Sequence, residues 1–246
     1  MVRLFFAVLV LMCFSPAQAA TIAIIIDDVG NSHNDTQVLN LPDEVTISVL
    51  PHTPYGRQIA QRASLADREV MLHVPMETLS GYRLGPGAIV SDMSDAAIEQ
   101  QLLDSLVALP YAVGVNNHMG SKLTQMRKPM QVFMQALKER DLYFVDSRTT
   151  KYTLAEQVAD ETGVTNWRRH VFLDSIQSKA FVRKQLRLLI KTAEKQGFAI
   201  AIGHPYPETL AVLLEELPLL EKHIMISRIS HLPQTDMNTR YAYSAE

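Results

Sequence analysis

The chain has 246 residues, of which 47% are hydrophobic, and its formal net charge is -3 at pH 7. This length and apolar content predict one large domain with a substantial core. Lysine and arginine are scattered and do not outnumber the acidic residues, which argues against nucleic acid as a partner.

The N-terminal segment predicts a secretory signal peptide spanning residues 1–19. Arg3 precedes an apolar run at positions 4–14, and the small-residue pattern Ala-Gln-Ala occupies positions 17–19. These three parts place the cleavage site after Ala19. We therefore expect a periplasmic or secreted protein, with residues 20–246 as a single domain and no membrane span after cleavage. An uncleaved anchor is the alternative, although the apolar run is short for a bilayer span.

Short β-branched runs then alternate with amphipathic stretches along the chain. Strands are expected at 21–26, 45–50, 69–74, 111–115, 142–145, 170–173, 198–202 and 224–229. Helices are expected at 55–66, 94–108, 127–140, 153–162, 178–196 and 207–222. The helix at 178–196 has the clearest limits, with Ser178 as N-cap and Gly197 as its stop. This α/β alternation predicts a parallel sheet covered by helices, either a (β/α) barrel or a doubly wound sheet.

Polar residues follow almost every predicted strand. Segments 31–42 and 79–93, which come after two of these strands, are expected to be loops. The residues at the strand ends are Asp27 and Asp28, His52, His73 and Glu77, Asn116, Asn117 and His118, Asp146 and Arg148, Asp174, and His204. In a parallel barrel the carboxyl ends of all strands open onto one face. The sequence therefore predicts a cluster of Asp and His side chains there.

Single polar residues have simpler interpretations. Asp35 and Asp43 are expected to form turns or helix caps, and His170, His223 and His231 are expected to be hydrogen-bonded structural residues. The adjacent pair Asp27 and Asp28 differs, because two carboxylates held together are unfavourable unless a cation or a proton lies beside them.

One carboxylate and two imidazoles are a common set of ligands for a divalent metal that keeps one position open, and Zn²⁺ is the first choice for such a set. A second carboxylate can then act as general base and a further histidine as general acid. The strand-end residues supply all of these groups.

Five segments, "IIIDDVGN", "LHVPME", "NNHMGS", "VDSRT" and "IGHPYPET", together resemble the divergent polysaccharide deacetylase family, a branch of the NodB-like glycoside hydrolase/deacetylase superfamily. The resemblance covers about residues 21 to 230. It implies a distorted (β/α) barrel of seven or eight mainly parallel strands. It also implies metal-dependent removal of N- or O-acetyl groups from carbohydrate.

The resemblance assigns Asp27 as catalytic base, Asp28 and His73 as metal ligands, and His204 as the residue that assists the leaving group. The chain departs from the family at position 77, where Glu77 stands in place of a second histidine, and "NNHMGS" replaces an Arg-x-Pro-Tyr segment. We infer that His118 supplies the missing imidazole, with Glu77 as the rival third ligand.

Four further residues are candidates for binding substrate. Arg148 can steer a sugar or a carboxylate with Asp146 holding it, although an ordinary salt bridge is an equal alternative. Tyr206 can stack on a sugar ring, and Asn117 lies among the same strand ends.

The first hypothesis is thus a metal-dependent hydrolase that removes acetyl groups from a cell-wall or other exported polysaccharide. Two alternatives stay open. One is a catalytically degenerate envelope protein that binds a glycan or a partner, and the other is a metal-dependent hydrolase of another bond, such as a peptidoglycan amide.

Overall fold

The computed structural model describes residues 20–234, so the predicted signal peptide lies outside the described residues. Within them, one nine-stranded sheet contains β1 (Ala20–Val29), β2 (Thr46–Val49), β3 (Val70–Met76), β4 (Gly114–Met119), β5 (Tyr143–Asp146), β6 (Asn166–Arg168), β7 (Val171–Phe172), β8 (Phe198–Gly203) and β9 (Ile224–Ile226).

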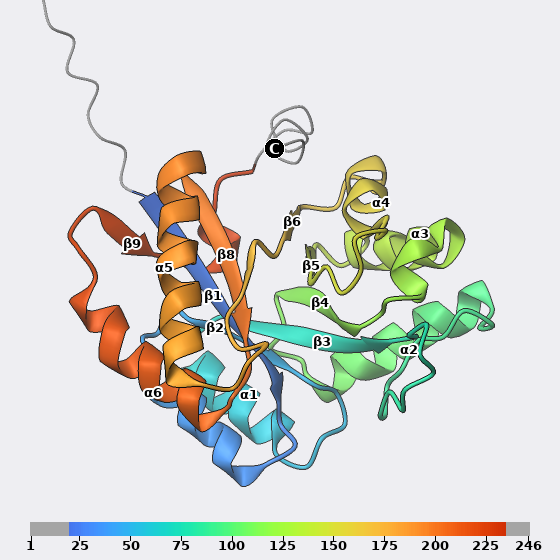
Figure 1. The fold of residues 1–246 in the computed structure, drawn as a ribbon. Coiled ribbons are helices and arrows are strands. Elements are labelled where there is room, and N and C mark those ends of the chain that lie inside the picture. Colours follow the sequence, from blue (N-terminus) through green and yellow to red (C-terminus); the bar gives the residue numbers. More distant parts are fainter. Residues whose placement is uncertain (1–19, 235–246) are drawn as a thin grey trace, which may run out of the picture.

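Eight of these strands form a curled half-barrel in the order β6-β5-β4-β3-β2-β1-β8-β7 (Figure 1). All of their pairings are parallel, and β9 adds a short parallel pairing to the start of β1. The predicted parallel, distorted barrel is confirmed, with β6 and β7 as its two edges. The sequence missed β6, because its residues Asn-Trp-Arg form no apolar run.

In the described part of the chain, six α-helices connect the strands: α1 (Gly56–Leu65), α2 (Asp95–Ala108), α3 (Arg127–Lys138), α4 (Ala155–Thr162), α5 (Lys179–Gln196) and α6 (Pro207–Glu216). Helix α5 begins and ends as predicted. The Ser178 hydroxyl accepts a hydrogen bond from the backbone of Phe181, and Gly197 ends the helix at a φ of 91°. The helix predicted to reach residue 222 ends at Glu216, and a short 3-10 turn with a proline, η3 (Leu217–Leu219), follows it.

Three further 3-10 segments are η1 (His33–Asn40), η2 (Leu123–Gln125) and η4 (Ile229–His231). Segment 31–42 was predicted to be a loop, but most of it forms the 3-10 segment η1. Ser32 caps η1, and the carboxylate of Asp35 accepts hydrogen bonds from the backbone of Gly30 and Ser32. The expected turn-forming role of Asp35 is therefore confirmed.

Alternation along the strands divides the core in two. On β1, Ile22, Ile24 and Ile26 belong to the larger cluster between sheet and helices, whereas Ala23 and Ile25 belong to a smaller one inside the barrel. Side chains alternate between the faces of a strand, so every second residue points into the barrel. Beyond the last apolar residue of each such inward-facing row, the next inward-facing residue is polar. These rows are Ala23-Ile25-Asp27, Met71-His73, Tyr143-Val145-Ser147 and Ile200-Ile202-His204.

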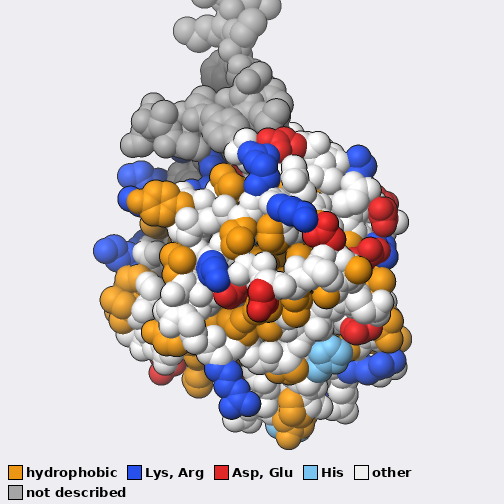
Figure 2. Space-filling view, turned by 90° about the vertical axis from the view of Figure 1, so that its right-hand side faces the viewer, with side chains coloured by type: hydrophobic (Ala, Val, Ile, Leu, Met, Phe, Trp, Pro, Cys, Tyr) orange, Lys and Arg blue, Asp and Glu red, His pale blue; other side chains and the backbone are white. Residues whose placement is uncertain are grey.

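Figure 2 shows one face, on which basic and acidic side chains are interspersed with apolar ones. Across residues 20–234, none of the helices combines the length and the apolarity that a membrane crossing requires.

Candidate metal centre

A distortion at the end of β1 brings both adjacent carboxylates to the same pocket. The pairing of β1 with β2 shifts register between Ile26 and Val29, and Asp28 adopts a left-handed φ of 60°. In a regular strand Asp27 and Asp28 would face opposite sides of the sheet. The left-handed conformation costs about 1–2 kcal/mol, and it turns Asp28 toward the residues around Asp27.

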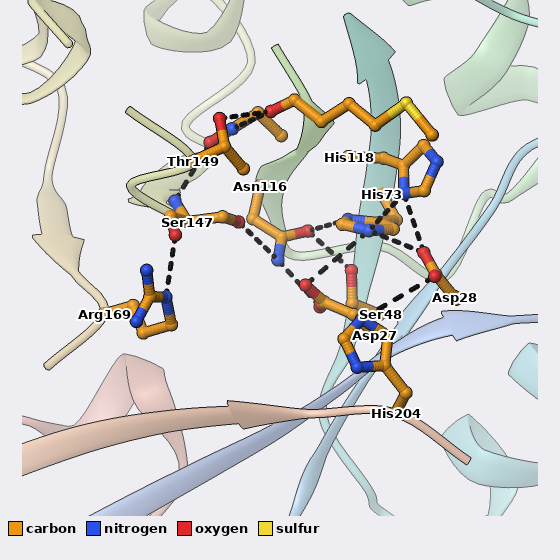
Figure 3. A network of polar contacts seen from close by, with 12 residues as sticks. Asp27, Asp28, Ser48, His73, Asn116, His118, Ser147, Thr149, Arg169 and His204 are labelled. Carbon is orange, nitrogen blue, oxygen red and sulfur yellow. Dashed lines mark hydrogen bonds and ion pairs between the residues drawn. The ribbon is translucent and has the colours of Figure 1, made fainter. Parts of the chain in front are cut away.

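Asp28, His73 and His118 converge on one point (Figure 3). Oδ1 of Asp28 lies 2.7 Å from Nδ1 of His118 and 3.1 Å from Nε2 of His73. The two ring nitrogens are 3.2 Å apart. Ligand atoms of a tetrahedral zinc site with bonds of about 2.0–2.1 Å lie about 3.3 Å from one another. The three predicted ligands therefore have the spacing of one face of such a site.

Hydrogen bonding at these three residues also fits a cation. Among the described residues, no group donates a hydrogen bond of good geometry to the buried Oδ1 of Asp28. Nδ1 of His73 lies 2.7 Å from Oδ1 of Asn116, an acceptor, so this nitrogen carries the proton and Nε2 keeps its lone pair. An unsatisfied carboxylate oxygen beside a ring nitrogen with a free lone pair is the arrangement that a metal ion completes.

Glu77, the rival third ligand, is engaged elsewhere. Its carboxylate lies 2.6 Å from Nζ of Lys122 and accepts a 2.7 Å hydrogen bond from the backbone of Ser91. Within residues 20–234, a single set of three Asp, Glu, His or Cys residues has ligand atoms close enough to share a metal ion. This set is Asp28, His73 and His118. The structure thus favours His118 over Glu77.

Asp27 lies beside the three possible ligands but is not one of them. Its Oδ1 accepts a 2.8 Å hydrogen bond from Nδ2 of Asn116, and its Oδ2 is 3.6 Å from Nε2 of His73. Burial raises the pKa of Asp27, against the opposing charges of His73 and His204. Asp28 shows the reverse, because His118 and His73 overcome the effect of burial and hold its pKa far below the usual range.

His204 is oriented by a buried carboxylate that follows β7. Nδ1 of His204 lies 2.9 Å from Oδ1 of Asp174, and Oδ2 of Asp174 accepts hydrogen bonds from the His204 backbone and the Thr209 hydroxyl. Nε2 of His204 therefore faces the site, 3.7 Å from Oδ2 of Asp28. Burial alone would lower the pKa of His204, but the hydrogen bond and charge of Asp174, with Asp28 and Asp27, raise it.

These residues line a cavity of about 440 Å³. Besides the five carboxylate and imidazole side chains, its wall contains Asn117, Met119, Ser147, Arg148, Thr149, Arg169, Phe172 and Ile202. Two of the predicted substrate-binding residues, Asn117 and Arg148, thus lie at the cavity.

The other two, Asp146 and Tyr206, are not part of its lining. Asp146 is fully buried and accepts hydrogen bonds from the backbone of Arg148 and the hydroxyl of Thr153. It therefore holds the backbone of this turn, whereas the nearest carboxylate to the Arg148 side chain is that of Glu156, at 3.9 Å. The ring of Tyr206 lies 5.4 Å from that of His204.

Sequence reasoning assigned no role to four residues that organise the site: Asn116, Ser147, Arg169 and Asp174. Asn116 links His73 to Asp27 and accepts a 2.6 Å hydrogen bond from the Ser48 hydroxyl. Counting every second residue along β4 and β5 places Asn116 and Ser147 on the inner face, which is the signal that could have found them. No sequence pattern singled out Arg169.

The curled, parallel sheet defines the class of NodB-like (β/α) barrels, and comparison with known proteins agrees with this class. The model of the family described as divergent polysaccharide deacetylase matches residues 24–233. The chain belongs to this family.

Its curated relatives are uncharacterised. The Escherichia coli K12 protein YibQ is 42% identical over 229 residues, covering 92% of this chain and 72% of YibQ. A Haemophilus influenzae protein is 37% identical over 220 residues, covering 89% of this chain and 78% of its own length.

Solved structures share the fold at low sequence identity. An uncharacterised Agrobacterium tumefaciens C58 protein has a TM-score of 0.83 at 22% identity, covering 89% of this chain and 92% of that one. A family 4 carbohydrate esterase from Streptomyces lividans, solved with acetate, has a TM-score of 0.51 at 15% identity, covering 85% and 93%. A Bacillus anthracis pseudoenzyme of the same esterase family has a TM-score of 0.50 at 13% identity, covering 88% and 66%.

Proposed function

We propose that this protein is a zinc-dependent hydrolase that removes acetyl groups from carbohydrate. The observation that carries the proposal is the convergence of Asp28, His73 and His118 around an unsatisfied carboxylate oxygen, beside a second carboxylate and an oriented histidine. Asp28, His73 and His118 would hold the ion. When bound, a divalent cation acts as a Lewis acid that polarises an acyl carbonyl.

Asp27 takes the part of general base. It is buried, the amide of Asn116 fixes one of its oxygens, and its other oxygen faces His73. This arrangement leaves Oδ2 to accept the proton of a water molecule that attacks the acetyl carbon. A raised pKa makes Asp27 a stronger base than an exposed aspartate.

His204 takes the part of general acid. Its Nδ1 is directed at Asp174, so the proton it can deliver is on Nε2, which faces the site. Its raised pKa keeps the ring protonated closer to neutral pH, so it can protonate the leaving nitrogen or oxygen of the sugar.

The predicted signal peptide supports an exported polysaccharide, such as cell-wall material, as the substrate. The membership of the polysaccharide deacetylase family supports the same substrate class. Periplasmic or secreted localisation and the carbohydrate partner are parts of this proposal.

Acetate release from acetylated oligosaccharides, measured with the purified, zinc-loaded protein, tests the proposal. We expect chelation and Asp28→Ala each to abolish release, and zinc to restore it only to the chelated wild type. Asp92→Ala is the matched control, because Asp92 is exposed and is not part of the cavity lining. Activity that survives both chelation and Asp28→Ala would refute the proposal.

A binding protein without catalysis is the second candidate, and the observation that favours it is Glu77 at the position of the family's second histidine. The position of His118 against Asp28 argues for catalysis instead, because it supplies a second imidazole. Saturable binding of acetylated oligosaccharides without any acetate release would favour the binding protein.

A further inference from the structure

We propose that Arg148 and Arg169 form an oxyanion subsite in the wall of this cavity, so that the acylated sugar carries a carboxylate or phosphate substituent. The identity of the ligand as an acylated sugar rests on the proposed function. The existence of the anion subsite rests on the two guanidinium groups alone.

Arg169 is largely enclosed, and yet no carboxylate pairs with it. Its Nε donates to the carbonyl of Ser147 at 2.8 Å, and its Nη2 donates to the carbonyl of Arg148 at 3.0 Å. Its guanidinium carbon lies 5.1 Å above the ring of Phe172. Among residues 20–234, no Asp or Glu oxygen forms an ion pair with Arg169 within 4.0 Å. A guanidinium held in this way, at a cavity wall, attracts a counter-anion.

Arg148 is fixed beside it by the same turn. Its backbone has a left-handed φ of 48°, its N–H donates to Asp146, and its carbonyl accepts from Arg169. Its side chain is 31% exposed, and the nearest carboxylate, that of Glu156, is 3.9 Å away, beyond hydrogen-bonding distance. The turn thus presents a second guanidinium with unused donors to the cavity.

The charges around the cavity favour an anion at this position. Asp27 and Asp28 would offset the charge of a divalent ion held by Asp28, His73 and His118. The carboxylates near the arginines, Asp146 and Glu156, are not in the cavity lining. Asp146 and Glu156 act on the arginines from behind the wall, so the two guanidinium groups are the charges of this part of the wall that face the cavity. Planar guanidinium forks match the geometry of carboxylate and phosphate oxygens.

Three probes with one common acyl sugar test the subsite: N-acetylglucosamine, N-acetylmuramic acid with its carboxylate, and N-acetylglucosamine 6-phosphate. Calorimetry with the zinc-loaded Asp27→Asn protein measures binding without turnover. We expect at least one anionic sugar to bind roughly tenfold to a hundredfold tighter than the neutral one. Whichever anionic sugar shows the preference identifies the substituent.

Removal of either guanidinium group, in the protein that carries Asp27→Asn, should abolish the tighter binding of the anionic sugar. Arg148→Asn is suited to the test, because asparagine tolerates the left-handed backbone. Arg169→Gln provides a second variant, and Arg148→Asn decides the question if loss of the Arg169 contacts prevents folding. Lys151→Gln is the matched control, because it removes a positive charge from the same loop but not from the cavity lining.

The outcomes separate this inference from the proposed function. Equal binding of all three sugars, or a preference that survives Arg148→Asn, would overturn the subsite even if acetate is released. Binding that prefers an anionic sugar and depends on Arg148, with no acetate release by the wild type, would uphold the subsite and refute the deacetylase.

Discussion

Nδ1 of His73 and Oδ1 of Asn116 lie 2.7 Å apart across the neighbouring strands β3 and β4, where the two residues are direct register partners. This contact fixes the proton on Nδ1 and leaves Nε2 free for a metal ion. The other end of the Asn116 amide donates to Asp27. One buried side chain therefore orients both a ligand and the proposed base.

Replacement of this asparagine should weaken metal binding without removing a ligand. We expect Asn116→Leu to lower zinc affinity about 10- to 100-fold, because the His73 ring loses the acceptor that orients it. Competition with a chromogenic chelator measures the affinity. Ser48→Ala, which removes only the hydroxyl bonded to Asn116, should have a smaller effect. Unchanged affinity in Asn116→Leu would contradict this role.

Metal content separates the two candidates for the third ligand. His118→Ala should lose stoichiometric zinc, because Nδ1 of His118 lies 2.7 Å from Oδ1 of Asp28. Glu77→Gln should retain it, since the Glu77 carboxylate contacts Lys122 and Ser91 instead. Elemental analysis of the purified variants, with circular dichroism to verify folding, gives the result. Zinc retained in His118→Ala and lost in Glu77→Gln would reverse the assignment.

Asp174 should act through His204 rather than through the metal. In Asp174→Asn we expect kcat for acetate release to fall by roughly 10²–10⁴, because the amide no longer fixes the reactive tautomer of His204. Zinc content should not change, since Asp174 is outside the group of ligands. Thr209→Val, which removes one hydrogen bond to Asp174, is the milder comparison. Loss of zinc together with activity would show a structural role instead.

His170 should make stability depend on pH. Burial and the neighbouring charges of Arg168, Arg148 and Arg169 lower its pKa to about 4, and its Nδ1 accepts a hydrogen bond from the backbone of Ile200. The unfolded chain takes up this proton near pH 6.5, before the folded protein does. The free energy of unfolding should therefore fall as the pH drops from 6.5 toward 4, by up to about 3 kcal/mol.

Urea unfolding of wild type and His170→Gln, both in chelator, isolates this contribution. The variant should lose less stability than the wild type over this pH range. His52→Asn is the control, because it removes an exposed histidine from a left-handed position that asparagine tolerates. Parallel pH profiles for wild type and His170→Gln would contradict the prediction.

The regular elements were predictable because their signals are local. Helix α5 has an N-cap serine, an apolar face and a terminal glycine, so its limits follow from the sequence. Strand β6 was missed because it is three residues long and stabilised by pairing with β5, a contact that local sequence does not encode. For the same reason, the pairing of β9 with β1 could not be predicted.

The candidate site was predictable in composition and less so in detail. The convergence of Asp28, His73 and His118 followed from the rule that parallel strands end at one face. Asp146 was selected as a substrate contact, but the strand alternates there and Ser147 is the residue at the cavity. Arg169 reaches the cavity through contacts with Ser147 and Arg148 that are remote in sequence.

By itself, the sequence determined which residue types stand at the strand ends and that these ends belong to one parallel sheet, because both depend on short-range patterns of apolar and polar residues. The family resemblance assigned different roles to Asp27 and Asp28, but only the tertiary structure decided which side chains each carboxylate contacts. Asp27 continues the inner row of β1, and a shift of register with a left-handed φ at Asp28 brings the second carboxylate to the same pocket. Asp28 then contacts His73 and His118, whereas Asp27 accepts a hydrogen bond from Asn116. Such partners are set by packing across the sheet, which no local pattern specifies.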